Sequence, residues 1–220
     1  MGYMANESKN SNYPMSEHTM KPIKFVFDLD GTVTAEETLP LMAHHFDVEE
    51  EIEELTRETV QGNIPFVESF IRRVFILGKL PVDEVADLLE TARLHDQLAA
   101  FIREHPDHCA IATGNLECWS RKLLDKVGCE SHCSDALVED NRVVKLTKIL
   151  RKEQVVEDYQ RAGFNVVFVG DGNNDLEAMR VADVSIAAGL THEPSKSILP
   201  IADYLVFEEE ALCRQLSQLL

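Results

Sequence analysis

The 220-residue sequence predicts an α/β fold, with a Rossmann-like parallel sheet as its core and a small α-helical cap inserted into it. Two observations support this prediction. Short apolar runs alternate with stretches of helical length over most of the chain, which indicates parallel strands joined by right-handed crossovers. Residues 36–94 interrupt the alternation, because they contain consecutive helical patterns and no run typical of a strand.

Three apolar runs predict buried strands, and two weaker runs predict further strands. The first three are Ile23–Leu29, His108–Ala112 and Val166–Val169, and each is followed by a polar turn that contains glycine. Continuous apolar runs of this length are typical of parallel strands covered on both faces. The weaker pair is Val184–Ala187 and Tyr204–Phe207.

Helices are predicted between these strands. Two of them end at glycines, Gly128 and Gly163, the residue expected just after a helix C-terminus. Residues 134–146 indicate a small hairpin that turns at Asp140-Asn141. The predicted core helices are residues 116–127, 147–162, 175–182 and 208–219.

The helical insert defines the expected domain organisation. Apolar residues spaced by three and four, such as Phe66, Phe70 and Val74, predict amphipathic helices. We therefore expect a core of residues 21–35 and 95–220 and a cap of residues 36–94. The cap should lie over one end of the sheet as a lid, with hinges near Ala35 and Leu94.

Composition limits the class of partner. Apolar residues make up 45% and charged residues 27% of the chain, which is ordinary for a globular protein. The 39 acidic residues outnumber the 21 Lys and Arg residues, so the formal net charge is −18. Such a surface repels phosphate backbones and anionic lipids. We expect a small-molecule substrate, no nucleic-acid or membrane partner, and a monomer or homodimer.

The N-terminal residues and the cysteines predict the cellular compartment. Residues 1–20 are polar and aperiodic, so we expect a disordered lead before the fold starts near Lys21. We see no apolar leader segment and no apolar run near the roughly 18 residues of a membrane span. The 5 cysteines are odd in number and form no CxxC pair. Free thiols in a reducing cytoplasm are the simplest interpretation.

Four polar features lie at or near predicted strand ends, where ligands bind in open α/β sheets. They are Asp28–Thr32 (DLDGT), Thr113–Asn115 (TGN), Lys148 on the helix before the third strand, and Gly170–Asp175 (GDGNND).

The carboxylates of these features predict a metal site. Asp28, Asp30, Asp171 and Asp175 would converge if the strand ends are neighbours. Two like charges about 4 Å apart repel by about 4 kcal/mol at an effective dielectric constant of about 20, so the cluster needs a cation or must take up protons. Mg²⁺ fits a few carboxylates plus a phosphate, whereas Ca²⁺ is less well matched to so few ligands.

The remaining groups predict a phosphoryl-binding site. Gly31, Gly114 and Gly172 allow close backbone approach and expose N–H donors, while Thr113 adds a hydroxyl and Lys148 a positive charge. Phosphoryl transfer needs mainly positioning and neutralisation of oxygen charge. A carboxylate nucleophile can form an aspartyl-phosphate and divide the reaction into two steps.

In this order, the four motifs resemble those of the haloacid dehalogenase superfamily of phosphatases. The resemblance covers about residues 22–210. It implies that Asp28 is the nucleophile, and that Asp30 acts first as general acid and then as general base. It also implies that Thr113 and Lys148 hold phosphate oxygens.

The same resemblance implies the metal ligands. Asp171 would bind Mg²⁺ together with Asp28 and the backbone carbonyl of Asp30. Asp175 would support the metal directly or from behind its ligands.

Within the superfamily, the chain looks like the phosphoserine phosphatase subfamily, which carries a helical cap between its first two motifs. The resemblance implies that Glu37 binds a substrate ammonium and that Phe66 and Arg73 contact its carboxylate end. Gly114 and Asn174, in the second and fourth motifs, are also expected to contact substrate. The implied reaction is hydrolysis of O-phospho-L-serine; another phosphorylated amine, alcohol or sugar is the alternative, and a phosphoacceptor module is a more distant one.

Several residues have competing interpretations. Lys145 and Lys152 lie near Lys148 in the sequence, Glu36 precedes Glu37, and Arg72 precedes Arg73. Phe66 could belong to the cap core, and Asp175 could simply cap a helix. The chain also departs from the subfamily pattern, because Thr113-Gly114-Asn115 replaces the usual Ser-Gly-Gly and Val60 replaces a common Met. Its segment between Gly128 and Lys148 is shorter than usual.

Overall fold

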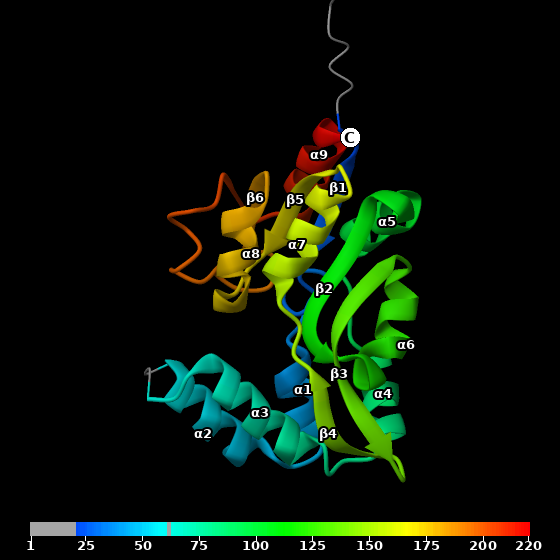
Figure 1. Cartoon of the computed structure of the whole chain (residues 1–220), viewed down its shortest axis with the longest axis vertical. Helices are drawn as coiled ribbons and strands as arrows, with labels where there is room; N and C mark the ends of the chain where they lie inside the picture. The colour runs from blue at the N-terminus through cyan, green and yellow to red at the C-terminus, as the bar shows by residue number, and fades with distance from the viewer. Residues whose placement is uncertain (1–20, 61–62) are drawn as a thin grey trace, which may run out of the picture.

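A computed structural model describes residues 21–60 and 63–220, and within these it leaves the side chains of Val60 and Phe66 undescribed. The predicted disordered lead, residues 1–20, therefore lies outside the described residues. The core is a seven-stranded sheet of order β4-β3-β2-β1-β5-β6-β7 (Figure 1). All neighbouring strands are parallel except β3 and β4. The strands are β1 Ile23–Phe27, β2 Cys109–Leu116, β3 Glu130–Glu139, β4 Arg142–Lys148, β5 Asn165–Gly170, β6 Val184–Ala188 and β7 Tyr204–Val206.

The central strands are buried on both faces, as their continuous apolar runs predict. Phe25, Val26 and Phe27 of β1 are fully buried. Because side chains alternate along a strand, Phe25 and Phe27 pack on one face and Val26 on the other, where it joins Phe168. This packing confirms the predicted α/β fold with a parallel core.

Helices cover the two faces of the sheet. One face packs against α5 (Asp96–Glu104), α6 (Glu117–Val127) and α9 (Glu209–Leu219), and the other against α7 (Lys152–Arg161) and α8 (Leu176–Val181). Single 3₁₀ turns, η1 Pro106–His108 and η2 Asn173–Asp175, precede β2 and α8. Helix α5 was not predicted from the sequence.

The start of the helix after the hairpin is wrongly predicted. Residues 147 and 148 belong to β4, and α7 begins only at Lys152. The end of β4 is set by pairing across the hairpin, because Lys148 lies opposite Asp135 of β3. The local sequence does not reveal this contact, since residues 147–151 run directly into the helical pattern of α7. The hairpin itself is confirmed: Asp140 and Asn141 form its turn with φ of 45° and 62°.

The predicted cap region contains four helices, and no strand occurs among its described residues. They are α1 Thr38–His45, α2 Glu49–Val60, α3 Phe66–Leu77 and α4 Val82–Glu90. Figure 1 shows α1, α2 and α3 below the carboxyl ends of the core strands. The predicted domain boundaries themselves remain a prediction. Among the described residues, no helix has the length and apolar character that crossing a membrane requires.

The cap is attached to the core at two places. Buried side chains of α4, Val85 and Leu89, share one apolar cluster with Trp119 of α6. The two connecting segments also pair with each other: the Ala35 N–H donates to the Arg93 carbonyl at 2.8 Å, and a β-bridge joins Thr34 and Leu94. The predicted hinge positions therefore lie side by side.

Leu89→Ala is expected to lower the free energy of unfolding by about 2–5 kcal/mol, because it leaves a cavity where cap and core meet. Leu199→Ala is the matched control, since Leu199 is 41% exposed, and it should cost less than about 1 kcal/mol. Urea denaturation measures both. Equal losses in the two variants would contradict the role of the shared cluster.

Candidate active site

The carboxyl ends of three adjacent strands converge on one cleft. Asp28 follows β1, Thr113 lies near the end of β2, and Asp171 follows β5; these strands are neighbours in the sheet and run in parallel. Their loops therefore meet at the same edge. A cleft of about 400 Å³ opens there. Its lining includes Asp28, Asp30, Glu37, Arg73, Asp171, Asn174 and His192.

Three carboxylates form the floor of the site. Oxygens of Asp28, Asp171 and Asp175 lie within 4.8 Å of one another, and the three residues are 4%, 4% and 0% exposed. Burial, and then the charge of Asp175, raise the pKa of Asp28 well above its usual range, while Lys152 opposes this shift. Burial also raises the pKa of Asp171 to about 7, against a lowering effect of the Thr32 hydroxyl, which donates to its Oδ1 at 2.6 Å.

A single buried ammonium separates two of these carboxylates. Lys152 Nζ lies 2.5 Å from Asp28 Oδ1 and 2.6 Å from Asp175 Oδ1, and its side chain is 5% exposed. Burial alone would lower the pKa of Lys152, but Asp175 and Asp28 raise it above its ordinary value. The lysine therefore stays charged and holds the loops after β1 and β5 together.

Lys152 is the lysine beside Asp28, where Lys148 was predicted to lie. The predicted position of Lys148 is therefore wrong. Lys148 is the last residue of β4, is exposed, and lies opposite Asp135 in the hairpin. The true helix starts four residues later, at Lys152. The error follows directly from the mistaken helix start at Thr147.

Asp175 organises the loop after β5. Its Oδ2 accepts the N–H groups of Asp171 at 3.0 Å and Gly172 at 2.8 Å, while its Oδ1 accepts from Lys152. The close approach requires glycine at position 170, because a Cβ there would lie 2.5 Å from Asp175 Oδ2. Asp175 thus does more than cap a helix, since it also positions the lysine.

Asp30 is held by donors from the cap and the core. Its Oδ1 accepts the N–H of Thr38 at 3.1 Å and also the Thr38 hydroxyl. Its Oδ2 accepts the amide of Asn115 at 2.9 Å. Burial raises the pKa of Asp30, although the hydrogen bond from the Thr38 hydroxyl lowers it in part. A raised pKa favours the protonated acid.

The residues of the second motif, Thr113–Asn115, do not line the main cleft. Thr113 is fully buried, and its hydroxyl oxygen accepts the N–H of Asn115 at 3.1 Å. Thr113 is not among the residues that line the cleft. Gly114 and Asn174 together line a smaller adjoining hollow of about 180 Å³, which Asp30 and Arg73 also line.

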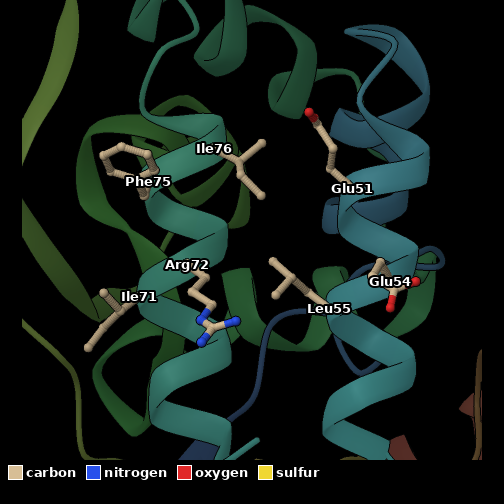
Figure 2. Close-up of a pocket in the computed structure, with 7 residues that line it drawn as sticks. All are labelled: Glu51, Glu54, Leu55, Ile71, Arg72, Phe75 and Ile76. Carbon is tan, nitrogen blue, oxygen red and sulfur yellow. The ribbon is translucent and has the colours of Figure 1, made fainter.

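Glu37 and Arg73 reach the cleft, as predicted, whereas their sequence neighbours do not line it. Glu36 accepts the N–H of Arg93 at 2.8 Å. Arg72 pairs with Glu68, and Figure 2 shows its guanidinium in a separate hollow between α2 and α3. That hollow, of about 510 Å³, shares no lining residue with the cleft. The side chain of Phe66 lies outside the described part of the structure.

Arg73 retains unused hydrogen-bonding capacity. One guanidinium nitrogen donates to the Thr56 hydroxyl at 3.1 Å, and within the described residues its buried Nε has no partner. Burial lowers the pKa of Arg73 from its usual value. A buried donor that lacks a partner is costly, so this arginine suits an anionic ligand.

His192 is a cleft residue that the sequence analysis missed. Its Nε2 lies 2.7 Å from Glu37 Oε1 and 3.2 Å from Asp171 Oδ2. Burial would lower the pKa of His192, but the Glu193 carbonyl, Glu37 and Asp171 raise it overall. His192 could have been predicted from its position after β6, because that strand ends at the same edge of the sheet as β1 and β5.

The donor set fits a divalent cation. Asp28, Asp171 and Asp175 carry three carboxylates, and Lys152 is the one ammonium that the structure describes in contact with them. The buried group therefore has an excess of about two negative charges when fully ionised, which a divalent ion would balance. All three ligand candidates are hard oxygen donors.

Comparison with known proteins agrees with this fold. A model of the haloacid dehalogenase-like hydrolases matches residues 25–183, and the chain belongs to that family. The predicted superfamily is thereby confirmed. Members of this family generally use a divalent metal, which is consistent with the carboxylate cluster.

Several named relatives are phosphoserine phosphatases. One from Saccharomyces cerevisiae is 30% identical over 179 residues, which cover 74% of this chain and 58% of that protein. One from Methanocaldococcus jannaschii is 26% identical over 175 residues, covering 74% of this chain and 83% of that protein. The chain thus spans little more than half of the yeast relative but most of the archaeal one.

Solved structures confirm the fold. A phospho-aspartyl intermediate analogue of phosphoserine phosphatase has a TM-score of 0.73 at 23% identity, covering 91% of this chain and 99% of that chain. A substrate-bound phosphoserine phosphatase complex has a TM-score of 0.74 at 22% identity, with the same coverage.

Lys152→Met should lower the free energy of unfolding by about 3–5 kcal/mol at pH 7 in EDTA, because it leaves buried carboxylates without their counter-charge. Lys148→Met is the matched control and should change it by less than about 0.5 kcal/mol. Chemical denaturation tests this pair. The assignment of Lys152 fails if the two variants are equally stable.

The raised pKa of Asp171 predicts a pH-dependent stability without metal. Because this pKa rises from 3.8 to about 7 on folding, the folded protein binds more protons between these values, and its stability falls as the pH increases through them. In EDTA, the free energy of unfolding of wild type should therefore fall by on the order of 2–4 kcal/mol between about pH 4 and pH 7, relative to that of Asp171→Asn.

A divalent cation provides the companion measurement. At pH 7, MgCl₂ should raise the melting temperature of wild type more than that of Asp171→Asn, because binding to the folded state alone stabilises it. Equal shifts in both proteins, together with a pH-independent stability difference, would contradict a metal site at Asp171.

Proposed function

We propose that this protein is a Mg²⁺-dependent phosphatase that hydrolyses O-phospho-L-serine through an aspartyl-phosphate on Asp28. The observation that carries the proposal is the buried Asp28–Lys152–Asp175 arrangement, whose Asp28 lines a cleft together with Asp30 and Arg73. The named relatives support the same activity.

Asp28 would attack phosphorus. Lys152 contacts its Oδ1, so we assign the attack to Oδ2. The ammonium opposes the effect of burial on the pKa of Asp28 and favours the ionised nucleophile. The same charge would stabilise negative charge on the phosphoryl oxygens as the ester bond breaks.

Asp30 would transfer protons in both steps. In its protonated form, favoured by its raised pKa, it gives a proton to the oxygen of the leaving serine as the P–O bond breaks. The resulting carboxylate then accepts a proton from the water that attacks the aspartyl-phosphate. Phosphate leaves, and Asp28 and Asp30 return to their starting forms.

Asp28, Asp171 and the backbone carbonyl of Asp30 would hold the Mg²⁺ ion. When bound, it would neutralise part of the charge on the carboxylates and on the phosphoryl group. Both Asp175 oxygens already accept hydrogen bonds, so we assign Asp175 to holding the Asp171–Gly172 backbone and Lys152 in place.

The cap residues would recognise the amino-acid end of the substrate. The Arg73 guanidinium, whose Nε has no partner in the described part of the chain, would bind the substrate carboxylate, while Glu37 would bind its ammonium. Gly114 and Asn174 line the adjoining hollow and would contact the substrate between these groups. A site of this kind discriminates against esters that leave its polar groups unpaired.

One observation favours a second candidate substrate. His192 already lies 2.7 Å from Glu37, so this carboxylate has a partner before any substrate binds. A phosphorylated alcohol or hydroxy acid without an ammonium group would leave that pair intact. A phosphoacceptor module is less well supported, because an acid-base residue beside Asp28 shortens the life of a phosphoenzyme.

A substrate panel tests the proposal. Wild type should hydrolyse O-phospho-L-serine with MgCl₂ and not with EDTA, and faster than it hydrolyses 2-phosphoglycolate or glycerol 3-phosphate. Asp28→Asn should abolish turnover of every ester. A preference for the two amine-free esters would favour the second candidate.

Arg73→Ala and Arg72→Ala form a matched pair within the panel. Loss of Arg73 should raise the KM for O-phospho-L-serine by about tenfold or more, since a charge-assisted hydrogen bond contributes about 1.5–3 kcal/mol. Loss of Arg72, which faces the separate hollow, should leave that KM unchanged. An unaltered KM in Arg73→Ala would reject the carboxylate contact.

A further inference from the structure

Asn115 links the core, the cap and the acid-base residue. Its side-chain amide donates one hydrogen bond to Asp30 Oδ2 at 2.9 Å and another to Thr38 Oγ1 at 3.0 Å. Its backbone N–H donates to Thr113 Oγ1 at 3.1 Å, within the last part of β2, where the register shifts between Thr113 and Leu116. The Ser-Gly-Gly motif common in the subfamily has glycine at this position, and glycine could make neither side-chain contact.

The donors and acceptors around Asp30 fit together in one way. Thr38 supplies two donors to Oδ1, its backbone N–H and its hydroxyl, which use both lone pairs of that oxygen. The Thr38 oxygen in turn accepts from Asn115. The opposite orientation of the amide would place its oxygen against two acceptors, so the donating orientation is the consistent one. Among the residues that the structure describes, Asn115 is the one donor to Asp30 Oδ2, which leaves one lone pair of that oxygen open.

We propose that Asn115 is a positioning residue that orients the Asp30 carboxyl group and places its transferable proton on Oδ2. The proposal rests on the proposed function, in which Asp30 protonates the leaving group. Oδ1 is saturated by Thr38, so the proton must reside on Oδ2 at the position that Asn115 leaves open. The amide therefore determines the direction from which Asp30 delivers its proton.

Proton delivery matters in proportion to the basicity of the leaving oxygen. When the P–O bond of an alkyl ester breaks, the departing alkoxide is strongly basic and takes the proton from Asp30 Oδ2, while the new bond forms between Asp28 and phosphorus. A p-nitrophenolate is weakly basic and departs without that proton. Asn115 should thus affect the two kinds of ester unequally.

The test compares kcat/KM for O-phospho-L-serine with kcat/KM for p-nitrophenyl phosphate. For each ester, kcat/KM reports the transfer of the phosphoryl group to Asp28 and not the later hydrolysis of the aspartyl-phosphate. Asn115→Ala should lower kcat/KM for phosphoserine by about tenfold or more, which is part of the 10²–10⁴-fold typical of general acid catalysis. The value for p-nitrophenyl phosphate should change by less than about threefold. Asn115→Gly, which restores the common motif residue, should give the same pattern if the alanine variant folds poorly.

Asn165→Ala is the matched control, because Asn165 starts β5 and does not line the cleft. It should leave both values within about twofold. Equal losses on both esters in the Asn115 variants would overturn the inference and leave the proposed function standing. If wild type hydrolyses another alkyl ester in place of phosphoserine, that ester takes its place in the comparison. A wild type that hydrolyses no alkyl ester would overturn both.

Discussion

The buried ammonium of Lys152 is the interaction on which the rest of the site depends. Carboxylates that follow two different strands, Asp28 and Asp175, could not lie so close together in a buried place without it. Through Asp175 the same contact also fixes the backbone that carries Asp171. The relative positions of Asp28 and Asp171, the proposed nucleophile and metal ligand, therefore follow from one lysine at the first turn of α7.

The features that the sequence predicts well are those set by local pattern. Buried parallel strands are continuously apolar and end in polar turns, so local pattern alone places Asp28, Asp30 and Asp171 at one edge of the sheet. The predictions failed where long-range packing decides. Pairing of Lys148 with Asp135 extends β4 through residues 147 and 148, which the local pattern assigned to a helix, and this error led to Lys148 in place of Lys152.

Side-chain contacts between distant segments could not be predicted from either local sequence. Asn115 meets Asp30 across 85 positions of the chain, and His192 meets Glu37 across 155. The sequence marked Asn115 only as a departure from the Ser-Gly-Gly motif, and it gave His192 no role at all. Neither contact could be inferred from the motifs alone. In the proposed mechanism, the Asn115–Asp30 contact affects proton delivery, and the His192–Glu37 contact affects whether Glu37 is free to bind a substrate.

The paired connections between core and cap have a consequence for how such a molecule can be assembled. Because Ala35 and Arg93 are joined by a hydrogen bond, the cap leaves and re-enters the core at almost the same point. A segment with adjacent ends can be exchanged for a longer, shorter or different one without moving the strands on either side. The strands that carry Asp28 and Asp171 could therefore stay in place while the inserted helices change.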